Sequence, residues 1–223
     1  MVTETGPNTT PRIPLSKERV LQAAVELADR GGSEAVSMRK LGQELGVDAM
    51  SLYHHVQNKG DILDGIVDAV VGEIDASPTD ADWRTAMRQL VMAAREVMLR
   101  HPWAPRVIEL RPTPGPATLR NMERALAILR DGGFSMGLTH HAIHVLGSRI
   151  LGFNQDLYDD SDVGDPEVAA LAARQMADQY PRVSELALAA THEGGLGGCD
   201  DDVEFAFGLD LILDGFERLR AAG

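Results

Sequence analysis

Histidine is the residue in this chain whose spacing best suits chemistry, because its side chain can bind a metal ion or transfer a proton near neutral pH. His140 and His144 lie four residues apart in a segment expected to be helical, so both share one helix face, as two ligands of a metal site do. A metal there would need a further ligand from elsewhere in the chain, either a carboxylate or His101. A role in lining a ligand pocket, or a structural or surface role, is the alternative that the sequence favours.

A second pair, His54 and His55, suits a metal poorly. Adjacent residues on a helix point about 100° apart, and no cysteine or acid stands at a supporting spacing nearby. The sequence also lacks a nucleophile elbow, a Gly-rich phosphate loop and an HExxH motif. Cys199, the only cysteine, precedes three aspartates that disfavour its thiolate. We therefore expect no enzyme, no metal and no cofactor.

The composition is that of a globular protein, with 223 residues of which 44% are hydrophobic. The N-terminal sequence MVTETGPNTTPRIP is unlike a signal peptide, and no apolar run reaches the ~18 residues of a membrane helix, so we expect a cytoplasmic protein without a membrane partner. The net charge of −13 is uneven: residues 1–62 hold seven basic and eight acidic side chains, and the remainder holds 14 and 26. This asymmetry indicates different partners for the two parts, or a solvated acidic surface on the second.

Apolar residues recur at helical spacing and no segment alternates with a period of two, so the predicted fold class is all-α. Capping residues and Gly or Pro breaks predict helices at about 16–30, 37–45, 48–56, 58–75, 83–100, 116–131, 135–158, 166–179 and 202–221. Residues 1–14 are expected to be a disordered arm. The break at Ser77-Pro78 then divides the chain into a domain over 15–76 and a larger helical domain over 77–223.

The stretch LGVDAMSLYHHVQNKGDIL, residues 45–63, predicts a helix-turn-helix in which Gly46 adopts the left-handed conformation after one helix. Leu52 and Val56 would hold the short second helix from inside, so that it can enter a DNA major groove ~12 Å wide. Ser37 and Lys59 begin the flanking helices, whose N-termini suit phosphates. The outer residues that would face bases or the DNA strands are Ala49, Met50, Tyr53 and His54.

A longer segment, LSKERVLQAAVELADRGGSEAVSMRKLGQELGVDAMSLYHHVQNKGDILDGIVD, closely resembles the DNA-binding domain of TetR-family transcriptional repressors. The matching features are the Ala-Ala run ending in Gly-Gly, Ser-Met-Arg-Lys-Leu, Leu-Gly-Val, Leu-Tyr-x-His-Val and Asn-Lys before an apolar helix. More faintly, Arg111-Pro112, Gly133-Phe134-Ser135 and the helix with Leu146-Gly147 resemble the regulatory domain of the tetracycline-repressor branch.

This resemblance implies a helix-turn-helix domain joined to a larger ligand-binding and dimerisation domain. The protein would be a homodimeric repressor that binds a palindromic double-stranded operator through helix 49–55 and is released by a small-molecule effector. Its regulatory domains would pair through helices near 138–157 and 203–219. Arg39 would reach bases, with Lys40 beside it. The residues that would hold phosphates are Ser37, Ser51, Tyr53, His55 and Lys59.

The effector is not identified by the sequence. In the tetracycline branch a histidine shortly before Arg-Pro holds a drug-bound magnesium, and residues 107–112 contain none, which argues against tetracycline. Aromatic, methionine and polar side chains of the second part could line an effector pocket or belong to the plain core. These candidates are Trp103, Met122, Phe134, His140, His144 and Asn154.

Two further functions compete with the repressor. One is a helical enzyme or metal-binding protein that uses His140 and His144. The other is a dimeric interaction module without DNA binding, which the net charge of −13 favours. The cations clustered around the helix-turn-helix argue against this module.

Overall fold

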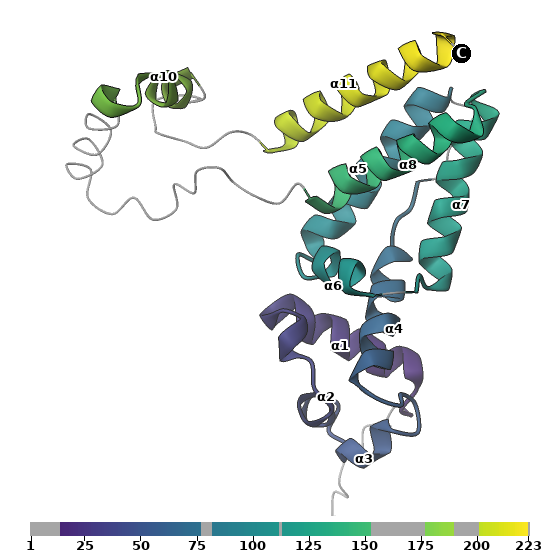
Figure 1. The fold of residues 1–223 in the computed structure, drawn as a ribbon. Helices are drawn as coiled ribbons and strands as arrows, with labels where there is room; N and C mark the ends of the chain where they lie inside the picture. Colours follow the sequence, from purple (N-terminus) through teal and green to yellow (C-terminus); the bar gives the residue numbers. More distant parts are fainter. Residues whose placement is uncertain (1–13, 77–81, 112, 153–176, 190–200, 223) are drawn as a thin grey trace, which may run out of the picture. The chain divides into compact units, whose positions relative to one another are not determined.

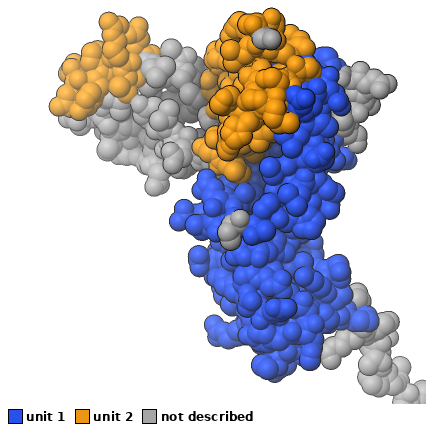
Figure 2. Space-filling model, turned by 45° about the vertical axis from the view of Figure 1, so that its right-hand side comes forward, with its two compact units in different colours: residues 1–132 blue, residues 133–223 orange. Residues whose placement is uncertain are grey.

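The computed structural model describes residues 14–76, 82–111, 113–152, 177–189 and 201–222, which form helices joined by turns, without a strand (Figure 1). The predicted all-α class is confirmed for this part of the chain. The chain divides into two compact units, residues 1–132 and 133–223 (Figure 2). None of the described helices combines the length and the apolar character that crossing a membrane requires.

The first unit starts with α1 (Lys17–Gly31), which begins where the Ser16 hydroxyl accepts a hydrogen bond from the Arg19 N–H at 3.2 Å. The buried face of α1 consists of Val20, Ala23, Ala24, Val25, Leu27 and Ala28. This face packs against α2 (Met38–Leu45) and α4 (Lys59–Val71). Helix α1 is thus the support on which the helix-turn-helix is built.

The remaining helices of the first unit follow α1 along the chain. A short 3-10 turn, η1 (Ser33–Ala35), leads into α2, and α3 (Ala49–Leu52) follows. Helix α4 then runs on to contact α5 (Trp83–Arg100), α6 (Ala104–Leu110) and α7 (Pro116–Asp131), with α5 packed on α7. Because α4 contacts both α1 and the α5–α7 group, it connects the two sets of helices.

The second unit contains α8 (Met136–Gly152), α10 (Pro181–Ala189) and α11 (Asp201–Ala222). Helices α8 and α11 pack together. The Arg149 guanidinium donates to the carbonyl oxygens of Glu204 and Phe205, at 2.9 and 3.2 Å, and lies 4.7 Å from the Phe205 ring centroid. Arg149 thus ties α8 to α11.

Some predicted elements differ from the structure. The helix predicted over 48–56 stops at Leu52, and residues 53–55 form a turn in which the His55 N–H donates to the Leu52 carbonyl oxygen at 2.8 Å. The helix predicted to reach 75 ends at Val71. Helices α6 and α10 were not predicted. Helix α6 lies between the helices predicted to end at 100 and to begin at 116, and it carries Pro105 in its first turn, where proline is tolerated.

Several predictions fall outside the described residues. They are the arm up to residue 13, the break at Ser77-Pro78, the end of the helix predicted to reach 158, most of the helix 166–179, Asn154 and Cys199.

Candidate nucleic-acid interface

Two glycines, Gly42 and Gly46, allow a tight turn between α2 and α3. Gly46 has φ 64° and ψ 36°, the left-handed conformation expected for it. Its N–H donates to the Gln43 carbonyl oxygen at 3.3 Å, and the Val47 N–H donates to that of Gly42 at 2.9 Å, which is the Schellman arrangement. A Cβ on Gly42 would lie 2.9 Å from the Val47 carbonyl oxygen and 3.3 Å from the Ala49 nitrogen. The missing side chain at Gly42 therefore lets α3 begin directly against α2.

Helix α3 and the turn after it have an apolar inner side and an exposed outer side. Leu52 and Val56 are 0% and 1% exposed, as their spacing predicted. Met50 and Tyr53 are 69% and 48% exposed. Two large side chains left in water, beside a helix held firmly from within, are typical of a surface that contacts a partner.

The helices on either side of α3 begin with capped N-termini. The Ser37 hydroxyl accepts from the Lys40 N–H of α2 at 3.3 Å, and Asn58 Oδ1 accepts from the Asp61 N–H of α4 at 3.0 Å. Asp61 Oδ2 in turn accepts from the Gln57 N–H at 3.0 Å. In the usual capping box the donor is the N–H of the N-cap residue, which here is Asn58, one residue later. The remaining N–H groups and partial positive charge of these helix starts suit anionic oxygens.

The predicted DNA-contact residues lie on α2, on α3 with its following turn, and at the start of α4. Those exposed are Arg39, Lys40, Met50, Tyr53, His54 and Lys59, and those partly exposed are Ser37, Ala49, Ser51 and His55. Lys59 Nζ is 3.6 Å from Glu34 Oε2. A surface ion pair of this kind contributes little to stability, so Lys59 can exchange it for a contact with a phosphate. Within the described ranges no acid forms an ion pair with Arg39 or Lys40.

Helix α4 is attached to α6 and α7 by contacts that were not predicted from the sequence. The Arg111 guanidinium forms a two-pronged ion pair with the Asp64 carboxylate. Asp68 Oδ1 accepts the Ala117 backbone N–H, in the first turn of α7, at 2.6 Å. The only signal in the sequence was the spacing of Asp64 and Asp68, four residues apart on one face of α4.

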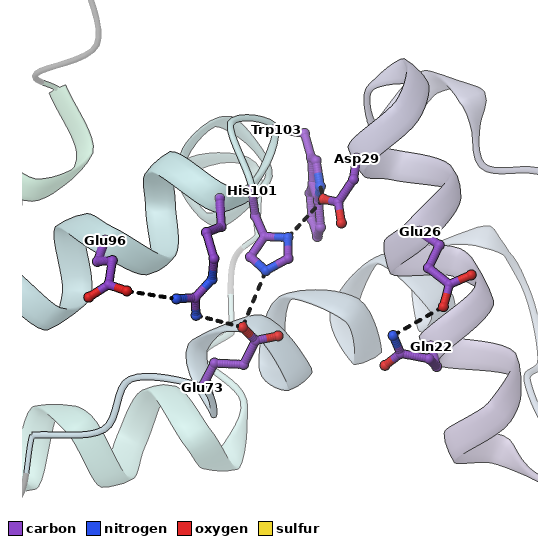
Figure 3. A network of polar contacts seen from close by, with 8 residues as sticks. Gln22, Glu26, Asp29, Glu73, Glu96, His101 and Trp103 are labelled. Atoms are coloured by element: carbon purple, nitrogen blue, oxygen red, sulfur yellow. Dashed lines mark hydrogen bonds and ion pairs between the residues drawn. The ribbon is translucent and has the colours of Figure 1, made fainter.

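A second attachment joins the end of α1 to the corner between α5 and α6 (Figure 3). Asp29 Oδ1 accepts from Trp103 Nε1 at 2.7 Å and lies 2.7 Å from His101 Nδ1. The other ring nitrogen of His101, Nε2, is 3.3 Å from Glu73 Oε2, which also accepts from Arg100 at 2.9 Å. His101 is 7% exposed and Trp103 is 8% exposed. From the sequence, His101 was a candidate only as a further ligand for a metal at His140 and His144, and its contacts with Asp29 and Glu73 were not predicted.

The candidate pocket residues are distributed over both units. Trp103 and Met122 belong to the first unit, where Trp103 is engaged by Asp29 and Met122 is 42% exposed on α7. Phe134 belongs to the second unit, is 1% exposed and meets the Phe216 ring edge-on, at 6.4 Å between centroids. Phe134 and Trp103 thus each take part in the packing of their own unit.

The histidines of α8 lie close together on the surface of the second unit. The His140 ring centroid is 4.6 Å from that of His144 and 5.7 Å from that of His141, and all three residues are exposed. In the described part of the chain, no group of three or more His, Cys, Asp or Glu side chains could hold a metal ion.

Two protein families' models match the chain. Residues 20–66 match the model for bacterial regulatory proteins of the tetR family, and residues 76–220 match the model for the tetracyclin repressor-like C-terminal domain. The first match covers the helix-turn-helix and the second covers most of the remaining helices.

Individual proteins are similar over nearly the whole chain. The HTH-type transcriptional repressor DrrR1 of Streptomyces coeruleorubidus is 32% identical, covering 96% of this chain and 82% of its own. The class C tetracycline repressor of Escherichia coli is 27% identical over 92% of each chain. The crystal structure of ActR of Streptomyces coelicolor in complex with actinorhodin has a TM-score of 0.70 and 27% identity, covering 93% of this chain and 99% of ActR.

Proposed function

The chain belongs to the TetR family of bacterial regulatory proteins, and we propose that this ligand-responsive transcriptional repressor acts as a homodimer on a palindromic operator. Each subunit would place α3 and the following turn, residues 49–55, in the major groove of one half-site. The observation that carries this assignment is the contrast along α3 and the turn after it, where Leu52 and Val56 are buried while Met50 and Tyr53 are exposed. We assign DNA binding to residues 15–76 and regulation to residues 77–223.

The roles of the DNA-contact residues follow from their places. Arg39, Ala49, Met50 and His54 would face base edges, and the apolar Met50 suits a thymine methyl group. The residues that would contact phosphates are Ser37, Lys40, Ser51, Tyr53, His55 and Lys59. Their positions at two helix N-termini and around α3 support a division between positioning by phosphates and specificity from bases.

The proposed dimer surface lies on α8 and α11. Val203, Phe207 and Leu211 follow one another at four-residue spacing on α11 and are 57%, 61% and 55% exposed. Such a row of large apolar side chains on one helix face is typical of a surface that pairs with a second helix. We therefore propose pairing through residues near 138–157 and 203–219, as the sequence predicted.

The proposed effector is a small molecule, as actinorhodin is in the ActR complex. Its binding among the helices after α4 would release the operator by moving α4, because Asp64 and Asp68 attach α4 to α6 and α7. The candidate pocket residues remain Trp103, Met122, Phe134, His140, His144 and Asn154. A protein of this kind acts on DNA in the cytoplasm and needs no catalytic group, so we propose no enzymatic activity.

The test is a selection of bound sequences from random duplex DNA at moderate salt. We expect an enriched palindrome with half-sites about one helical turn apart. The Tyr53→Ala variant should lose the enrichment, whereas Leu119→Ala, altered at an exposed position of α7, should keep it. No enrichment by a folded, dimeric wild-type protein would refute the proposed function.

A further inference from the structure

The corner that joins α1 to α5 and α6 brings together three helix ends. Asp29 lies in the last turn of α1, Glu73 directly follows the C-cap residue of α4, Gly72, and His101 is the C-cap residue of α5. Helix C-termini carry partial negative charge, so a carboxylate beside one is unfavourable unless donors surround it. The acids of this corner are therefore placed where their own helices do not stabilise them.

The donors come from the other side of the corner. His101 directs one ring nitrogen at each carboxylate, Trp103 adds a second donor to Asp29, and Arg100 adds a second donor to Glu73. The imidazolium form of His101 donates to both acids at once, and a neutral ring can donate to only one of them. The ring is 7% exposed, so water competes little for these contacts.

Because α1 packs along α4, α1–α3 and the first turns of α4 form one body, which we call the DNA-binding head (residues 17–64). Along α4, the head is attached to α6 and α7 through Asp64 and the neighbouring Asp68. A body attached only along one helix can still rotate about the axis of that helix. The contact of Asp29 with His101 and Trp103 is an attachment on a different helix, and it opposes this rotation.

We propose that His101, held between Asp29 and Glu73, is a positioning residue for DNA binding that fixes the angle of the DNA-binding head on α4. This inference rests on the proposed function, because the angle matters when two heads of a dimer must meet two half-sites. The contact would leave each head's own binding of a half-site unchanged. It would set which spacing between half-sites the dimer accepts.

The experiment compares operator variants and protein variants. The selected operator is tested against the same operator with two base pairs inserted between its half-sites, using fluorescence anisotropy with the purified full-length protein. We expect His101→Gln and Asp29→Asn to reduce the preference for the natural spacing about tenfold, a usual size for coupling between sites. The slope of affinity against salt should stay that of wild type, because the phosphate contacts remain.

Two further variants separate positioning from folding. Trp103→Phe removes the indole donor to Asp29 but keeps an aromatic ring at this position, and it should shift the spacing preference in the same direction. Glu26→Gln alters another α1 acid, which is bound by Gln22 on the same helix and lies outside the corner, and should behave as wild type (Figure 3). The Asp29→Asn, His101→Gln double variant should lose no more preference than the worse single variant, since both remove one shared contact.

The outcomes are distinct. Corner variants that melt at lower temperature but keep the wild-type spacing preference would overturn the positioning role and leave a purely structural contact. A salt slope that falls with the preference would overturn it too, because the phosphate contacts themselves would then have been lost. A folded wild-type protein that selects no operator would instead refute the proposed function, and this inference with it.

Discussion

Replacing Gly42 by alanine tests whether the close approach of α2 and α3 sets the position of the recognition helix α3. The new Cβ would lie 2.9 Å from the Val47 carbonyl oxygen and 3.3 Å from the Ala49 nitrogen. Both neighbours are backbone atoms at the start of α3, so no flexible side chain can turn aside. The carbonyl oxygen must move by about 0.5 Å to reach the 3.4 Å at which ordinary contact begins.

The expected effect on stability is a balance of two terms. Alanine is favoured over glycine inside a helix by about 1 kcal/mol, so propensity alone would make the variant more stable. Overpacking of a tight contact costs about 1–3 kcal/mol. We therefore expect Gly42→Ala to lower the free energy of unfolding by about 1 kcal/mol, measured by urea denaturation followed by circular dichroism.

The effect on DNA binding should be larger than this loss of stability suggests. A shifted α3 keeps its phosphate contacts but misplaces the side chains at the base edges, where each good contact is worth about 1–3 kcal/mol. We expect the variant to bind the selected operator about tenfold more weakly in anisotropy titrations, which corresponds to about 1.4 kcal/mol. Non-specific DNA should bind as before.

The control is Gln43→Ala, the next residue of α2, which is exposed and should keep operator affinity. If Gly42→Ala is more stable than wild type and binds the operator equally well, the argument from close approach is refuted. Equal weakening on operator and non-specific DNA would contradict it as well, because phosphate contacts would then have been lost.

Three other predictions concern charge, assembly and capping. Lys59→Ala should weaken binding to all sequences about equally and reduce the salt slope by about one, as titrations at several salt concentrations would measure. Phe207→Glu places a charge in the exposed apolar row of α11 and should raise the dimer dissociation constant at least about tenfold in sedimentation equilibrium. The Thr85 side-chain and backbone hydrogen bonds lower the pKa of Asp82, the cap of α5, so its stabilisation is present above the ordinary carboxyl pKa and lost as the pH falls through the lowered value. Asp82→Ala should therefore lower the melting temperature at neutral pH, and the difference from wild type should become smaller in acid.

Each of the three has its own control. A Lys59→Ala protein with an unchanged salt slope would remove that residue from the phosphate contacts. Leu119→Glu places the same charge at an exposed position of α7, outside the proposed dimer surface, and an equal loss of dimer there would contradict the assignment. Asp82→Asn keeps a capping oxygen without the charge, and its melting temperature should depend less on pH than that of wild type.

Much of the fold was predictable because helix ends depend on neighbouring residues. Ser16, Ser37 and Asn58 cap the helices that they were expected to cap, and Gly46 adopts the expected left-handed conformation. The inner and outer sides of α3 followed from helical spacing alone. Helix α6 was missed because the preceding helix was ended before Pro102 and no further helix was predicted before 116, although a proline such as Pro105 is compatible with a first turn.

The attachments between helices were not predictable in the same way. Asp29 and His101 are 72 residues apart, and neither stands in a local pattern that would distinguish it from a solvated acid or an incidental histidine. Their contact depends on how α1, α4 and α5 pack, which spacing along one helix does not determine. The histidines that did attract attention, His140 and His144, remain exposed on α8.

The corner at the end of α1 also bears on whether the DNA-binding head can be exchanged between relatives. A chimera that takes residues 17–64 from another protein brings a foreign side chain to position 29 but keeps His101 and Trp103 facing it. Unless the graft supplies an acid there, two buried donors lose their acceptor, which is costly. Hybrid regulators made from this chain therefore need a matched residue 29, and changes on the two sides of the corner must accumulate together.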